Sequence, residues 1–256
     1  MVYACYSCPD PMLLQFLKKN LSPSFDKRPK GVKPSIVLLH YTGMETAQAA
    51  FDRLCDPASK VSAHYFIDED GKTTQLVKDD LRAWHAGVSF WQGITDINAH
   101  SIGIEIVNPG HDHGYRSFPP LQMMAVAKLC NTLIKKYDIR ADRILAHSDV
   151  APERKQDPGE LFDWHFLYGE GIGLIPQPTQ ADFDEAAKRA RSDFSLHTML
   201  EDYGYSALAA YEDLVVAFHR HFAPEKFQPG QNPAKPDEAT IARLLSLIRQ
   251  QKALKA

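Results

Sequence analysis

Two histidines stand where a metal ion or a ligand is expected to bind. His40 ends the apolar run SIVLLH, residues 35–40, which predicts a central strand covered on both faces. His147 ends RILAH, residues 143–147, a second short predicted strand that opens into a polar loop. The carboxyl ends of strands in an α/β sheet are where ligands bind. Either histidine alone is more often a structural residue with ordinary hydrogen bonds.

The loop after His147 carries Lys155 and Asp157, which point to the same side of an extended segment. A catalytic zinc site uses three protein ligands from histidine and carboxylate, and leaves the fourth position for water. His40, His147 and Asp157 match that count, with Lys155 facing a substrate oxygen. The alternative is a solvated salt bridge between Lys155 and Asp157.

Glu105 is an acid in the middle of a predicted strand, SIGIEIV at residues 101–107. The isoleucines of this strand share one face, and Glu105 lies on the other. A partly desolvated carboxylate has a raised pKa, which suits a general base that activates water at a metal. The alternative is a glutamate on an edge strand that faces solvent.

The elements around these residues predict an α/β domain that extends to about residue 178. Apart from the strands already named, the pattern predicts a helix over about 45–55, a hairpin of residues 61–68 and 73–78 with its turn at Gly71, and a long helix over about 120–137. Strands mixed with helices in this order indicate one central sheet flanked by helices.

The chain after residue 178 predicts a small helical domain, residues 179–256. It follows a proline-rich connector, GIGLIPQPTQ, and contains no convincing strand. The expected helices span about 182–203, 207–222 and 237–251. Apolar stripes on the last two, with Tyr211, Leu214, Val215, Phe218 and Phe222 on one and Ile241, Leu244, Leu245 and Ile248 on the other, are typical of the core of a small bundle.

Composition excludes some functions. The 256 residues are 44% hydrophobic and carry a net charge of −3 with a pI near 6.4, which gives no support for nucleic-acid binding. No apolar run approaches the roughly 20 residues of a membrane span. The first residues lack the features of a secretory signal, so we expect a cytoplasmic monomer, or a periplasmic or envelope protein if a leader was removed.

The cysteines are not expected to take part in function. Cys5 and Cys8 form a C-x-x-C pair, which is half a zinc site or a redox pair in other contexts, but no second pair occurs. We interpret them as uninvolved thiols. Cys55 and Cys130 fall in helical patterns and are expected to be small buried hydrophobic residues.

Five sequence blocks occur in an order that resembles a known family. They are HYTG from His40, SAHYFIDEDG at 62–71, AWHAG at 83–87, SIGIEIVN at 101–108 and AHSDVAPERKQDPG at 146–159. From about residue 35 to residue 176 the chain resembles the N-acetylmuramoyl-L-alanine amidases of the amidase-2 family, the AmpD and AmiD type, which are related to peptidoglycan-recognition proteins. The resemblance implies their fold, a central mixed sheet flanked by helices.

The resemblance also implies an activity, which is hydrolysis of the amide between N-acetylmuramic acid, or its anhydro form, and the L-alanine of the stem peptide. One Zn²⁺ per chain would be held by His40, His147 and Asp157. Glu105 would act as acid and base, and Lys155 would stabilise the oxyanion. Peptidoglycan or anhydro-muropeptides would be the ligands. Trp84 and His85 of the AWHAG block would line the groove, although either residue could equally be core.

The C-terminal region is similar to a type-1 peptidoglycan-binding domain, a three-helix module. The similarity rests on LEDYGY at 200–205, AFHRHFAP at 217–224 and DEATIARLLSLI at 237–248, with His219 where such modules usually have glutamine. Such a module favours intact cell wall as substrate, as in AmiD-type enzymes of the envelope. The missing signal features favour soluble anhydro-muropeptides, as in cytoplasmic AmpD-type enzymes.

Two other classes of protein compete with this interpretation. A non-catalytic peptidoglycan receptor on the same fold would lack a zinc ligand, whereas all three are present. A structural zinc protein would use four ligands rich in cysteine, and no cysteine lies in the five blocks.

Overall fold

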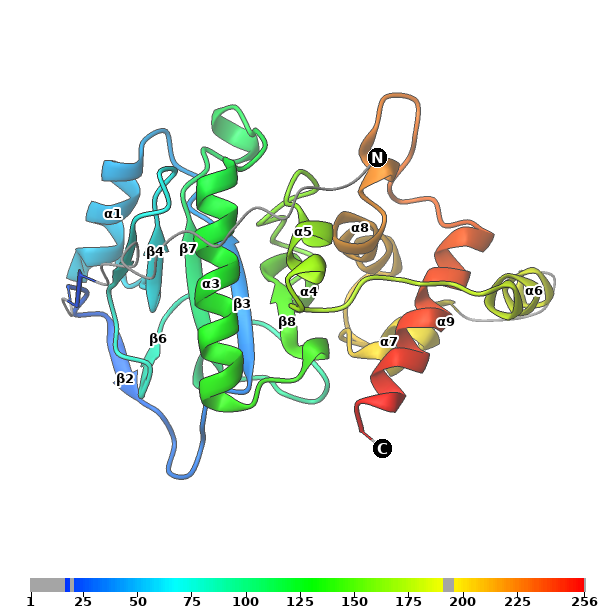
Figure 1. Ribbon diagram of the computed structural model, residues 1–256, viewed down its shortest axis with the longest axis horizontal. Helices are drawn as coiled ribbons and strands as arrows, with labels where there is room; N and C mark the ends of the chain where they lie inside the picture. The colour runs from blue at the N-terminus through cyan, green and yellow to red at the C-terminus, as the bar shows by residue number, and fades with distance from the viewer. Residues whose placement is uncertain (1–16, 19–20, 191–195, 256) are drawn as a thin grey trace, which may run out of the picture.

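The protein is described by a computed structural model that covers residues 17–18, 21–190 and 196–255. A mixed sheet forms its centre, with helices packed against it and a helical region at the C-terminal end (Figure 1). The strand order is β1 (Leu17–Lys18), β5 (Thr73–Gln75), β4 (Tyr65–Ile67), β7 (Ser101–Ile106), β3 (Ile36–Tyr41) and β8 (Ile144–Ala146). A separate antiparallel ribbon pairs β2 (Phe25–Lys27) with β6 (Leu81–Ala83). The predicted α/β class is confirmed.

Strand β3 lies inside the sheet, between β7 and β8, and runs parallel to both. Its residues alternate between two hydrophobic clusters, with Val37 and Leu39 on one face and Ile36 and Leu38 on the other. The prediction of a strand covered on both faces is therefore confirmed. The parallel register places His40 opposite Glu105 on β7.

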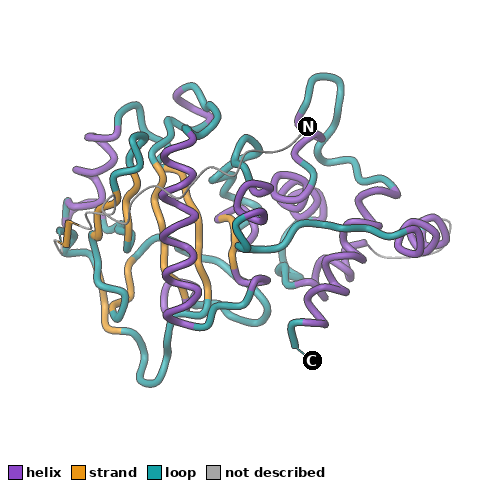
Figure 2. The backbone as a smooth tube through the Cα atoms, in the orientation of Figure 1, coloured by secondary structure: helices purple, strands orange, loops and turns teal. Residues whose placement is uncertain are grey.

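Two helices cover parts of the sheet as the sequence predicts. Helix α3 (Pro120–Tyr137) packs against the isoleucines of β7 on the face that carries Val37, and Figure 2 shows it in front of the sheet, running along the strands. Helix α1 (Ala47–Cys55) starts two residues later than predicted, because the Thr46 hydroxyl caps it by accepting from the Ala49 N–H. Cys130 is buried on α3, where burial raises the pKa of its thiol to about 12, and Cys55 is only partly buried.

The prediction that His147 ends a strand is wrong by one residue. Strand β8 stops at Ala146, and His147 is the first residue of a short helix, α4 (His147–Val150). The Asp149 carboxylate accepts a hydrogen bond from the Ala146 N–H (2.8 Å) and so caps the first turn of this helix. The expected hairpin is confirmed as the antiparallel pair β4 and β5.

The C-terminal region is helical, as predicted, but its first element is divided. The single helix predicted over 182–203 is described as two, α6 (Gln180–Arg189) and α7 (Leu196–Tyr203), on either side of residues 191–195. Helices α8 (Tyr211–Phe222) and α9 (Glu238–Ala253) correspond to the other two predicted segments, although α8 starts four residues later than predicted. Their apolar stripes are largely buried, although Tyr211 is 39% exposed. Helix α5 (Trp164–Gly169) precedes the connector, and the short helix α2 (Ile97–His100) precedes β7.

The helical region and the sheet share one hydrophobic cluster. This cluster joins Ile36, Leu38 and Leu145 of the strands to apolar residues of α7, α8 and α9. The division into domains 1–178 and 179–256 stays a prediction. Cys5 and Cys8 lie outside the described residues. In the part of the chain that the structure describes, no helix is both long and apolar enough to cross a membrane.

Candidate metal centre

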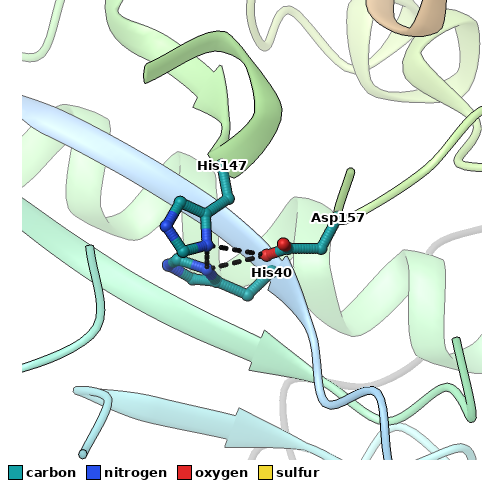
Figure 3. A group of neighbouring side chains, drawn as sticks. All are labelled: His40, His147 and Asp157. Carbon is teal, nitrogen blue, oxygen red and sulfur yellow. Dashed lines mark hydrogen bonds and ion pairs between the residues drawn. The ribbon is translucent and has the colours of Figure 1, made fainter. Parts of the chain in front are cut away.

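His40, His147 and Asp157 converge on one point at the carboxyl end of β3 (Figure 3). The His40 Nδ1 atom lies 2.9 Å from the His147 Nδ1 atom, and each nitrogen lies 3.0 Å from the Asp157 Oδ2 atom. All three residues are buried, with exposed fractions of 5% or less. Three elements supply them, namely β3, α4 and the loop that follows α4.

The hydrogen bond at the far side of each imidazole decides which nitrogen is free to bind a cation. His147 Nε2 lies 3.0 Å from the carbonyl oxygen of Ala86. A carbonyl only accepts hydrogen bonds, so Nε2 must carry the proton. The Nδ1 atom of a neutral His147 therefore presents a lone pair to the centre.

A longer chain of hydrogen bonds gives the same result for His40. The Ser101 hydroxyl donates to the Ile97 carbonyl (2.7 Å), so its oxygen accepts from His85 Nε2 (3.3 Å). His85 Nδ1 then accepts from His40 Nε2, which lies 3.0 Å away. Because His40 is protonated at Nε2, its Nδ1 atom also presents a lone pair. Such outer contacts fix the tautomer and the orientation of metal-binding histidines.

The three residues fit a divalent metal. Two nitrogen lone pairs and one carboxylate oxygen face one another without a proton between the nitrogens, which is unfavourable unless a cation lies among them. A tetrahedral ion with bonds of about 2.0–2.1 Å would hold such atoms about 3.3 Å apart. Burial, then the charge of His147, lowers the pKa of His40 to about 4, so protons do not compete for its nitrogen at neutral pH.

Glu105 is placed beside this centre by the register of β7 and β3. It lines the same cavity, and its Oε2 atom is buried with no hydrogen-bond partner among the described residues. Burial, then the negative charge of Asp157, raises the pKa of Glu105 to about 8, although the charge of Lys155 opposes this shift. A carboxylate with a raised pKa and a free oxygen is suited to accept and return a proton.

The cavity that contains these residues measures about 350 Å³, within the size range of small-molecule sites. Lys155, Trp84 and His85 line it together with the metal-binding group and Glu105. The indole N–H of Trp84 donates to Asp26 (2.7 Å), which fixes the ring at the cavity wall. Both ring nitrogens of His85 are used in hydrogen bonds, one to Ser101 and one to His40. The ring therefore contacts a residue of the candidate metal centre directly. The roles predicted for these three residues stay predictions.

Sequence reasoning missed Arg154, although it stands next to Lys155 in the same block. Its guanidinium donates to the carbonyl oxygens of Ala86 and Val88, and it lines the cavity. Arg154 thus holds the loop whose Ala86 carbonyl also accepts a hydrogen bond from His147. The pair of adjacent basic residues, Arg154 and Lys155, was the sequence feature that could have indicated its role.

Gly103 on β7 leaves the space that the His85 ring occupies. A Cβ atom at this position would lie 2.5 Å from the His85 Cγ and Nδ1 atoms, closer than such contacts allow. We therefore expect Gly103→Ala to displace the ring, to lower stability by about 1–3 kcal/mol and to weaken metal binding about tenfold or more. Thermal denaturation and zinc titration of the metal-free protein measure the two effects.

Gly169 provides the matched control, since a Cβ atom there would meet nothing within 4 Å. Gly169→Ala should leave both quantities unchanged or raise stability slightly. If Gly103→Ala binds zinc as tightly as the unaltered protein, then His85 does not orient His40.

Comparison with known proteins gives these features a context. The family model described as N-acetylmuramoyl-L-alanine amidase matches residues 30–160, about half of the chain. The amidase AmiD of Escherichia coli is 34% identical over 209 residues, which cover 74% of this chain and 75% of that protein. The 1,6-anhydro-N-acetylmuramyl-L-alanine amidase AmpD of Haemophilus influenzae is 36% identical over 170 residues, covering 59% of this chain and 90% of that protein.

Solved structures agree with the sequence relatives. The complex of E. coli AmiD with the substrate anhydro-N-acetylmuramic acid-L-Ala-D-γ-Glu-L-Lys superposes with a TM-score of 0.71 at 30% identity, covering 88% of this chain and 93% of that one. AmpDh3 of Pseudomonas aeruginosa reaches 0.74 at 29% identity, covering 98% of both chains. On the family match and the relatives together, the chain belongs to the N-acetylmuramoyl-L-alanine amidase family.

Proposed function

We propose that this chain is a zinc amidase that hydrolyses the bond between the lactyl group of N-acetylmuramic acid, or its anhydro form, and the L-alanine of the stem peptide. The observation that carries the proposal is the convergence of His40, His147 and Asp157 next to Glu105 in one cavity. Two imidazoles and one carboxylate are a donor set that zinc uses in catalytic sites. Peptidoglycan fragments as ligands are supported by two relatives that were solved with anhydro-muropeptides, AmiD and AmpDh3.

Zinc bound at these residues would supply Lewis acidity, which polarises a carbonyl and lowers the pKa of water to about 7. Glu105 takes the proton of the attacking water as the new bond to the lactyl carbon forms. It then delivers that proton to the alanine nitrogen as the carbon–nitrogen bond breaks. The products are a lactyl carboxylate and a stem peptide with a free amino terminus.

Lys155 would stabilise the negative charge that develops on the carbonyl oxygen, an effect typically worth a few kcal/mol. Its position on the cavity wall, in the same loop as Asp157, supports this role. Trp84 would support the substrate as part of the wall. Its indole N–H already binds Asp26, so only its ring is free to contact sugar or peptide.

The test is hydrolysis of a defined anhydro-muropeptide by metal-free protein to which Zn²⁺ is restored. We expect a peptide that begins with alanine and carries a new free amine, identified by mass spectrometry. Cleavage at another bond, or equal turnover after chelation, would contradict the proposal. A parallel assay on intact sacculi establishes which form of substrate is preferred.

The compartment and the oligomeric state stay predictions, a cytoplasmic monomer with the periplasm or envelope as the alternative. A strong preference for soluble anhydro-muropeptide would favour the cytoplasm. Efficient release of peptides from sacculi would favour the envelope. Light scattering of the purified protein measures the oligomeric state.

A further inference from the structure

A short helix carries one of the metal-binding residues and depends on its surroundings for its shape. Helix α4 spans only His147–Val150, and isolated helices of this length do not form in water. Its third residue, Asp149, is 1% exposed. The Asp149 carboxylate caps the helix through the Ala146 N–H, but a buried carboxylate needs further partners.

Those partners come from the C-terminal helical region. Tyr205 donates its hydroxyl proton to Asp149 Oδ1 (2.9 Å), and His221 Nδ1 lies 2.8 Å from Asp149 Oδ2. Tyr205 follows α7 and His221 lies on α8, and both side chains are buried. The two contacts span 56 and 72 residues of sequence. The helix that presents His147 is thus held from the other end of the chain.

The His221 ring is itself fixed. It stacks between the Trp164 ring, whose centroid lies 3.7 Å away, and the Phe222 ring at 3.8 Å. Trp164 starts α5, which lies before the connector, whereas Phe222 ends α8. Because aromatic rings stack against both faces of the His221 ring, its orientation is fixed, and its Nδ1 atom stays directed at Asp149.

The same region holds the loop on the other side of His147. The Phe90 N–H donates to the Val150 carbonyl (2.8 Å) at the end of α4, and the Gln92 N–H donates to the Gly204 carbonyl (2.8 Å). Between them, the Trp91 ring packs edge to face with Tyr205 at 5.0 Å. This loop continues from Ala86, whose carbonyl accepts from His147.

The block that resembled a wall-binding motif faces inward. His219 contacts the Pro233 carbonyl and the Thr240 hydroxyl, and it is fully buried. Its neighbour Arg220 donates to Glu160, whose carboxylate contacts His111 at the cavity wall. Together with His221, these side chains are engaged within the protein.

We propose that α8 and Tyr205 form a positioning unit for the metal centre, which holds Asp149 and thereby fixes α4 and the imidazole of His147. The helical region then serves the reaction whether or not it binds cell wall. The inference rests on the proposed function only where turnover is concerned. Its effect on metal affinity can be measured without a substrate.

Paired substitutions separate the hydrogen bond from the packing. His221→Phe keeps a stacked ring and removes the donor, whereas His221→Asn keeps an N–H group near the Nδ1 position and removes the stacking. Tyr205→Phe removes only the hydroxyl. Leu247→Ala on α9 is the control, because Leu247 is buried in the shared cluster on a helix that supplies neither partner of Asp149, and its loss destabilises the same region.

The measurements use the whole chain, with folding checked by circular dichroism. The metal-free variants are titrated with Zn²⁺ against a chromophoric chelator, and their Co²⁺ forms are compared by visible absorption. We expect Tyr205→Phe and His221→Phe each to raise the Kd for zinc about tenfold, the effect of losing an outer contact of a metal site. The cobalt spectrum should change in the same two variants. His221→Asn and Leu247→Ala should stay within about threefold of the unaltered protein.

Two results would overturn the proposal. One is an unchanged zinc affinity in Tyr205→Phe and His221→Phe with a loss confined to turnover of intact sacculi, which would make the region a wall-binding module only. The other is an equal loss in Leu247→Ala, which would reduce the effect to general stability. If the unaltered protein cleaves no muropeptide but the zinc pattern appears as expected, the positioning role stands and the proposed function fails.

Discussion

Replacing Glu105 by glutamine is expected to lower kcat for muropeptide hydrolysis by roughly 10²–10⁴-fold while the metal stays bound. Glutamine has nearly the shape of glutamate but cannot accept the proton of the attacking water. His40, His147 and Asp157 are untouched, so the zinc content measured by mass spectrometry should equal that of the unaltered protein. Steady-state kinetics on a soluble anhydro-muropeptide measures the loss.

The control for this change is Glu153→Gln. Glu153 is exposed and lies in the loop between His147 and Asp157, so its substitution removes the same charge close to the site. Its kcat should stay within about twofold, as for other surface substitutions. Full activity in Glu105→Gln would exclude Glu105 as the base.

The raised pKa of Glu105 also makes the folding stability depend on pH, which can be measured without a substrate. In the metal-free protein its pKa is raised to about 8, whereas the unfolded chain has a pKa near 4.5. The folded state therefore holds a proton that the unfolded state releases, and stability falls as the pH rises from about 4.5 through 8. Glu105→Gln removes this dependence. The variant should gain stability relative to the unaltered protein at pH 8.5, on the order of 2 kcal/mol after screening at the cavity mouth, and little at pH 4.

Much of the site follows from local sequence patterns. The apolar run before His40 and the alternation around Glu105 predict two strands of a sheet, and parallel pairing brings their polar residues to one edge. The structure confirms this, because His40 lies opposite Glu105. Helix α3 has the predicted bounds, since its heptad-like apolar spacing spans the whole element.

Other parts depend on contacts that no local pattern contains. His85 was expected to line a groove, but its orientation comes from Ser101 and from the space above Gly103. The start of α4 depends on Asp149, whose partners lie more than 50 residues further along the chain. Such pairings are set by the packing of the helical region against the sheet, and a single sequence without that packing gives no sign of them.

The second large effect concerns Asp157, the carboxylate of the metal centre. Its exposed fraction is 5%, and its Oδ2 atom lies 3.0 Å from both imidazole nitrogens. Asp157→Asn keeps the size of the side chain and removes its charge. The two neutral imidazoles that remain are one ligand short of the three that a catalytic zinc site uses. We expect the Kd for zinc to rise more than about a hundredfold, beyond the usual effect of an outer contact. Competition titration of the metal-free protein measures it.

The metal-free protein shows why the charge of Asp157 matters. Burial favours the neutral carboxyl, but the two imidazoles of His147 and His40 beside it prevail and hold the pKa of Asp157 well below its usual range. The residue is therefore ionised whenever zinc is present at neutral pH, and no proton has to leave before it binds. Because the folded pKa is depressed, this interaction stabilises the metal-free fold above about pH 4 and is lost as the pH falls further.

Asp112→Asn is the matched control for Asp157→Asn, because it removes an exposed carboxylate from the wall of the same cavity. If both variants lose zinc to the same extent, the effect comes from the general negative potential of the cavity. If Asp157→Asn retains zinc within about threefold, the third protein ligand is another group, and Glu105, which lines the cavity opposite His40, is the acid that could take its place. Loss in Asp157→Asn alone, with circular dichroism unchanged, leaves direct ligation as the remaining explanation, and the same variant should then lose muropeptide hydrolysis at zinc concentrations that saturate Asp112→Asn.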